Sequence, residues 1–263
     1  MPINKLLLFL VCFLAAELGH GMDVTRDEKR NEYTLYLSGT ITAGDLRKIV
    51  AAVAPPAVFP KYFTLESPGG DMVEAMAIGR FIRETASGTL VLKHCASACV
   101  LALIAGISRS ALEGSGVGLH RPYYESKEFA GLSLPDAEKK YKALREATRR
   151  YLEEMEMPTE TIEKMFSISS DDVYYLTPLE KERVLVPPSA YSEWIRAKCS
   201  PPTAQEQELF KARGFNIFAQ FDKRPPTDPA FWAFVSKMDN AERCESALVR
   251  DVRKAVLAKY VNR

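Results

Sequence analysis

Ser97 and His120 are the two side chains whose residue types could together support nucleophilic catalysis. Ser97 stands among small residues at the expected start of a helix, and His120 ends an expected strand. A serine hydroxyl attacks a carbonyl well when a general base takes its proton, and histidine is the commonest such base. The alternatives are that Ser97 only caps its helix and that His120 is a structural histidine.

Backbone amides that would stabilise a negative oxygen come from two turns. The segment 67–70 reads Ser-Pro-Gly-Gly, and its glycines allow the backbone at Gly70 to approach a substrate closely. The amide of Ala98 follows Ser97 at the expected amino end of a helix, where peptide N–H groups are free. Together they are candidates for an oxyanion hole, although a Pro-Gly-Gly segment is also an ordinary turn.

Four cysteines follow the amino-terminal segment and can pair in three ways, of which proximity in sequence favours one: Cys95 with Cys99, and Cys199 with Cys244. A disulfide between the first two would clamp the turn around Ser97, and helical spacing brings the Cα atoms within disulfide range. One of these cysteines acting as the nucleophile is the competing hypothesis. Only His94 lies near them, so we expect no metal site, and no motif indicates a cofactor.

The elements that must position these residues alternate between strands and helices. Strands are expected at 33–37, 62–65 and 89–92. Two helices are expected between them: one that a capping box of Thr42 with Asp45 opens and that runs through Val53, and one at 71–84. This order predicts an α/β fold with a parallel sheet, whose ligands bind at the carboxyl ends of the strands. The segments 67–70 and 94–99 would then lie at one edge.

Further elements are expected along the rest of the chain. A buried helix at 98–105, two short strands at 110–112 and 117–120, a long charged helix at 136–157, a helix at 160–166 and a strand at 173–176 complete a first domain at 22–188. The segment 189–263 reads as a helical carboxyl-terminal appendage whose aromatic residues are expected to pack inward.

Charge and the amino terminus limit the classes of function. The chain has 263 residues, 35 Lys+Arg and 34 Asp+Glu, and this balance provides no basic surface for nucleic acid. Residues 1–21 combine a basic start with an apolar run at 6–16, which predicts a signal peptide; an uncleaved anchor is the alternative. We expect an exported protein of the bacterial periplasm, without a stable membrane span after cleavage.

Four motifs in register resemble the Clp-type serine peptidases of the ClpP/crotonase superfamily, over about 33–186. They are Leu-Tyr-Leu-Ser-Gly at 35–39, Leu-Glu-Ser-Pro-Gly-Gly at 65–70, Ala-Ser-Ala at 96–98 with Ala-Gly at 105–106, and Val-Gly-Leu-His-Arg-Pro at 117–122. The resemblance implies stacked β-β-α crossovers around a mainly parallel core sheet and assembly into homo-oligomers. The helix at 136–157 falls where such subunits have a handle that mediates assembly.

The resemblance also implies roles for individual residues. Ser97 falls on the nucleophile, His120 on the general base, and the amides of Gly70 and Ala98 on the oxyanion hole. Val173 stands where the family has its orienting aspartate, so Asp172 or its neighbour Asp171 would have to serve.

Three functions are compatible with these motifs. The first is an exported serine peptidase or acyl hydrolase that acts on a peptide or protein substrate. The second is a catalytically silent scaffold or peptide-binding protein, which the missing aspartate favours. The third, acyl-thioester chemistry of the crotonase kind, explains neither Ser97 nor His120 and conflicts with export.

Overall fold

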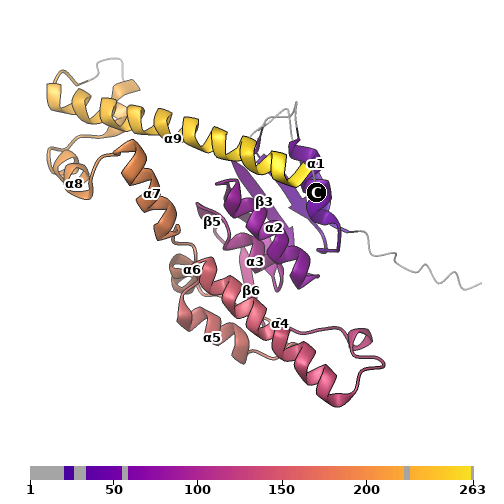
Figure 1. Ribbon diagram of the computed structural model, residues 1–263. Coiled ribbons are helices and arrows are strands. Elements are labelled where there is room, and N and C mark those ends of the chain that lie inside the picture. The colour runs from indigo at the N-terminus through magenta and orange to yellow at the C-terminus, as the bar shows by residue number, and fades with distance from the viewer. Residues whose placement is uncertain (1–20, 27–33, 55–58, 222–225, 262–263) are drawn as a thin grey trace, which may run out of the picture.

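The computed structural model describes residues 21–26, 34–54, 59–221 and 226–261, so nearly all of the expected signal peptide lies outside the described residues. The fold is α/β, built on a mixed sheet of seven strands (Figure 1). The strands are β1 (Asp23–Arg26), β2 (Thr34–Ser38), β3 (Tyr62–Ser67), β4 (Gly88–Ala96), β5 (Arg109–Ala111), β6 (Gly116–Leu119) and β7 (Tyr174–Tyr175). Their order is β1-β2-β3-β4-β6-β7, with β5 also paired to β4.

The centre of the sheet is parallel, as the sequence predicts. The strands β2, β3, β4 and β6 run parallel, β5 joins β4 in the same sense, and β1 and β7 are antiparallel. Strand residues such as Leu35, Phe63 and Leu65 are fully buried because helices cover a parallel sheet. The carboxyl ends of β3 and β4 therefore lie at one edge, where the turns carrying Gly70 and Ser97 begin.

Six helices accompany the sheet in the described part of the first 188 residues. They are α1 (Asp45–Val53), α2 (Met72–Glu84), α3 (Cys99–Leu103), α4 (Leu134–Glu154), α5 (Thr159–Ser167) and α6 (Pro178–Val184), with a 3-10 turn η1 (Ser126–Glu128). Tyr151 of α4 is fully buried and donates a hydrogen bond of 2.8 Å to the carbonyl of Leu101. Its hydroxyl lies where a Cβ on Gly79 would be, so the glycine lets α4 approach α2.

The carboxyl-terminal part is helical, as expected. It contains α7 (Ser189–Cys199), α8 (Ala204–Ala212), the 3-10 turn η2 (Ile217–Phe221) and α9 (Pro229–Val261). Phe210 and Phe231 are buried, but Phe218 and Phe221 are 71% and 79% exposed, so inward packing is wrong for these two aromatic residues. They lie on a turn with no buried residue of its own.

The last turns of α9 return to the main body (Figure 1). Tyr260 meets the ring of Phe81 at 5.0 Å between centroids, and Lys259 pairs with Glu84 at 2.7 Å. Arg253 donates to the carbonyl of Thr85 at 3.0 Å. The appendage thus contributes to closing the core beside α2.

Several local expectations are corrected by the structure. The strand expected at 89–92 continues as β4 to Ala96, and β1 pairs with β2 without having been predicted. The expected capping box fails because Gly44 is the cap of α1, while the carboxylate of Asp45 accepts from the amides of Thr42 and Met22. No helix within the described residues has the length and apolar character needed to cross a bilayer.

Candidate functional site

Ser97 occupies a sharp turn between β4 and α3. Its φ angle is 57°, in the left-handed region that residues other than glycine rarely adopt. The turn is held on both sides, because the Ser97 amide donates to the carbonyl of Gly118 at 2.9 Å and a disulfide joins Cys95 to Cys99. The side chain of Ser97 is half-buried, whereas both cysteines are fully buried. The predicted pairings of Cys95 with Cys99 and of Cys199 with Cys244 are both present.

The glycine turn after β3 packs directly against this serine. A Cβ on Gly69 would lie 2.7 Å from the Cβ of Ser97 and 3.0 Å from the amide nitrogen of Ala98, so only glycine fits. Gly70 has a φ angle of 137° and pairs with Ile41 in an isolated bridge. Within the described chain, the amides of Gly70 and Ala98 donate no hydrogen bond; Gly70 is exposed at the turn, whereas Ala98 is fully buried.

His120 follows β6 and faces the same cavity as Ser97. A cavity of about 500 Å³ is lined by both side chains together with Gly70. The imidazole is only 8% exposed, and its Nδ1 atom lies 2.9 Å from the carbonyl oxygen of Arg121. No described hydrogen bond joins His120 to Ser97, and such contacts often tighten only when a substrate is bound.

Aromatic and charged residues also line the cavity. Tyr123 lies 5.6 Å from the His120 ring, centroid to centroid, and is 46% exposed. Glu128 pairs with Lys140 at 2.9 Å, and this ion pair lowers the pKa of the Glu128 carboxyl. A second pair joins Lys127 to a neighbouring glutamate, so the charges of these residues are largely compensated.

The aspartates expected to orient His120 make no described hydrogen bond with it. Asp171 and Asp172 are exposed, and neither carboxylate makes a hydrogen bond within the described chain. Val173 lies beside strand β6 instead. Its Cγ1 is 2.7 Å from the position that a Cβ on Gly118 of this strand would take. The structure therefore brings Ser97, His120 and Gly70 to one cavity, and no described hydrogen bond joins a carboxylate to Ser97 or His120.

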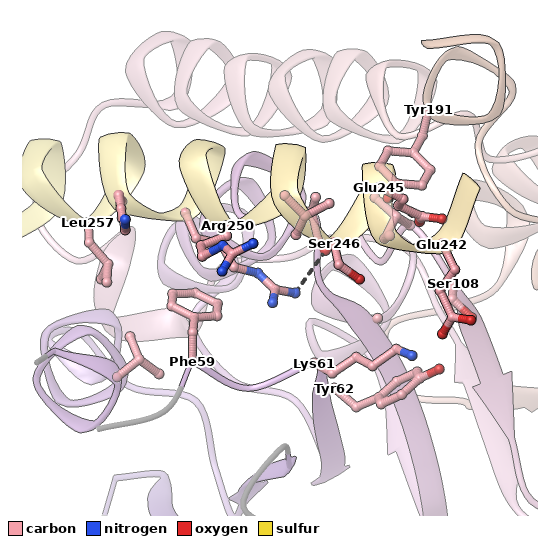
Figure 2. Close-up of a pocket in the computed structure, with 17 residues that line it drawn as sticks. Phe59, Lys61, Tyr62, Ser108, Tyr191, Glu242, Glu245, Ser246, Arg250 and Leu257 are labelled. Atoms are coloured by element: carbon pink, nitrogen blue, oxygen red, sulfur yellow. Dashed lines mark hydrogen bonds between the residues drawn. The ribbon is translucent and has the colours of Figure 1, made fainter. Parts of the chain in front are cut away.

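A larger cavity lies at the other edge of the sheet. It measures about 880 Å³ and is lined by Tyr62 and Gly88, which begin β3 and β4, and by residues of α9 (Figure 2). There Tyr191 donates a hydrogen bond of 2.7 Å to Glu245, and the guanidinium of Arg253 from α9 lies 4.8 Å from the centre of the Phe59 ring. This cavity is separate from Ser97 and contains neither a histidine nor a cysteine among its lining residues.

Two features of the site have no strong sequence signal. The contact between His120 and the Arg121 carbonyl involves the main chain, which any residue carries. In the sequence, only the pair of glycines at 69 and 70 indicates that Gly69 packs closely against Ser97. Among the described residues, no group of three or more His, Cys, Asp or Glu could hold a metal ion.

No protein-family model matches the chain, and no curated protein matches it either.

Proposed function

We propose that this chain is an exported serine peptidase, or a related acyl hydrolase, with Ser97 as nucleophile and His120 as general base. The left-handed backbone at Ser97 carries this proposal. Such a conformation costs about 1–2 kcal/mol, and sharp strand-to-helix turns of this kind present catalytic serines in other hydrolases. Here the turn is cross-linked, packed against a glycine and open to the cavity shared with His120.

The proposed reaction follows from these groups. His120 takes the proton of the Ser97 hydroxyl as its oxygen bonds to the substrate carbonyl carbon, and the carbonyl oxygen becomes negative. The amides of Gly70 and Ala98 donate to this oxygen. As the tetrahedral intermediate collapses, the carbon–nitrogen bond breaks and His120 returns the proton to the leaving amine. Water then cleaves the acyl-serine ester with His120 again as the base.

Ancestry and location belong to the same proposal. The motifs around Gly70, Ser97 and His120 resemble the Clp-type peptidases, and the parallel core of the sheet is compatible with a ClpP/crotonase fold. Two disulfides are typical of an oxidising compartment, which supports export, and we propose the bacterial periplasm.

A fluorophosphonate probe tests the proposal. We expect one covalent adduct by intact mass on the folded protein, and none on the Ser97→Ala variant. His120→Gln should slow labelling by at least a hundredfold, the usual loss when a general base is removed. His94→Gln is the matched control, because His94 lies on β4 and does not line the cavity. An adduct that persists in Ser97→Ala would refute the assignment of the nucleophile.

A silent scaffold or peptide-binding protein is the second candidate. It is favoured by Val173 and by the two exposed aspartates, which leave His120 without a carboxylate partner in the described chain. No adduct on folded protein, together with retained binding of peptides in the 500 Å³ cavity, would support this function instead.

A further inference from the structure

The protonation pattern of His120 can be deduced from its main-chain contact. Its Nδ1 lies 2.9 Å from the carbonyl oxygen of Arg121, a normal hydrogen-bond distance. A carbonyl oxygen only accepts hydrogen bonds, so a neutral imidazole in this position carries its hydrogen on Nδ1. The lone pair of the ring is then on Nε2, as a base that faces a serine hydroxyl requires.

We infer that the main-chain carbonyl of Arg121 is the positioning group of His120, in place of a carboxylate. This inference rests on the proposed function, since it explains how a serine–histidine pair works without an aspartate. In serine proteases the aspartate holds the imidazole in the tautomer with hydrogen on Nδ1, and losing it costs about 10⁴ in turnover because the tautomer is wrong. Here a neutral acceptor selects the same tautomer.

The neighbouring backbone holds the Arg121 carbonyl in place beside His120. The amide of Arg121 donates to the carbonyl of Ile168 at 3.1 Å, which anchors the peptide before it. The next residue, Pro122, is buried, and its ring restricts the backbone on the other side. Because His120 is itself nearly buried, little water competes for Nδ1.

The carbonyl should make Ser97 less reactive than a carboxylate partner of His120 would. A carboxylate both selects the tautomer and stabilises the imidazolium by its charge, whereas a carbonyl offers only a dipole. We therefore expect Ser97 to react with the fluorophosphonate more slowly than the serine of a complete triad, although faster than in His120→Gln.

Nitrogen NMR tests the tautomer without requiring activity. The chain has 3 histidines, so the full-length protein carrying His20→Gln and His94→Gln retains His120 alone. In its ¹⁵N-labelled form at high pH, Nδ1 should resonate as the protonated nitrogen and Nε2 as the unprotonated one. Free imidazole side chains favour the opposite tautomer, so a protonated Nε2 would overturn the inference.

An amide-to-ester exchange tests the function of the carbonyl. An α-hydroxy acid at position 122 turns the Arg121 carbonyl into an ester, which is a weaker acceptor; since Pro122 has no N–H, no native donor is lost. The hydroxy analogue of valine is compared with Pro122→Val, which keeps the amide. We expect the ester to slow labelling of Ser97 about fivefold, as weakening one neutral hydrogen bond does, and to lower the fraction of Nδ1-protonated ring.

Asp172→Asn provides the decisive comparison. Its labelling rate should equal that of the unchanged protein, because the carboxylate is exposed and makes no described hydrogen bond to His120. A fall of a thousandfold in this variant would overturn the inference and make Asp172 the orienting residue. Absence of any labelling of Ser97 refutes the proposed function, whereas the NMR result still decides whether the carbonyl sets the tautomer.

Discussion

Removing the disulfide that brackets Ser97 should slow the reaction of Ser97 as well as lower the stability of the protein. The Cys95–Cys99 bridge spans a sequence separation of 4, and loop-closure entropy for so short a loop is about 2 kcal/mol at 25 °C. The bridge holds Ser97 at a φ angle of 57°, a conformation that costs about 1–2 kcal/mol. In the Cys95→Ala/Cys99→Ala variant this turn can relax.

The second bridge is the natural control. Cys199–Cys244 spans a separation of 45 and joins α7 to α9, so the same calculation gives about 4 kcal/mol. Its residues are remote from the cavity that Ser97 lines. Cys199→Ala/Cys244→Ala should therefore lower stability more than Cys95→Ala/Cys99→Ala and leave labelling of Ser97 unchanged.

Two measurements separate the effect on stability from the effect on the reactivity of Ser97. Urea unfolding gives the free energy of unfolding, and the fluorophosphonate labelling rate gives the reactivity of Ser97. For Cys95→Ala/Cys99→Ala we expect a loss of about 2 kcal/mol and a tenfold slower labelling, the change equivalent to about 1.4 kcal/mol. Unchanged labelling in this variant would refute the idea that the cross-link maintains the left-handed turn. Equal labelling losses in both variants would attribute the effect to general destabilisation.

Two further changes test other contacts. Gly69→Ala should abolish labelling and destabilise the protein by about 1–3 kcal/mol, since the added Cβ would lie 2.7 Å from the Ser97 Cβ. In Gly131→Ala, at another positive φ angle but in open space, we expect a stability loss of about 1–2 kcal/mol from backbone strain alone in urea unfolding, and normal labelling. Glu180 has its pKa lowered to about 2, chiefly by the ion pair with Lys164. Because the folded-state pKa is below the unfolded value of about 4.3, Glu180→Gln should be less stable than the unchanged protein at neutral pH. This difference should shrink between about pH 4 and pH 2, and a gap independent of pH in urea titrations would contradict it.

Local patterns account for most of the elements that carry the site. Alternating hydrophobic runs and helix caps identify β2, β3, α2 and β6 within a few residues, because strand and helix periodicities are written into neighbouring side chains. The edge strand β1 was missed since only its antiparallel pairing with β2 makes it a strand. The full length of β4 was also missed, because its polar and small residues near His94 resemble a turn until β6 pairs with them.

The features of the site can also be separated into those that the sequence determined and those that only the tertiary structure decided. Residue types and order along the chain determined that Ser97, His120 and a double glycine are present, and that the parallel strands before the glycine turn and Ser97 bring these turns to one edge. Tertiary structure alone decided that Gly69 packs against Ser97, that Val173 lies beside β6, and that the Arg121 carbonyl meets His120. These last contacts depend on backbone atoms and on packing distances of a few ångströms, and no residue type encodes either of them.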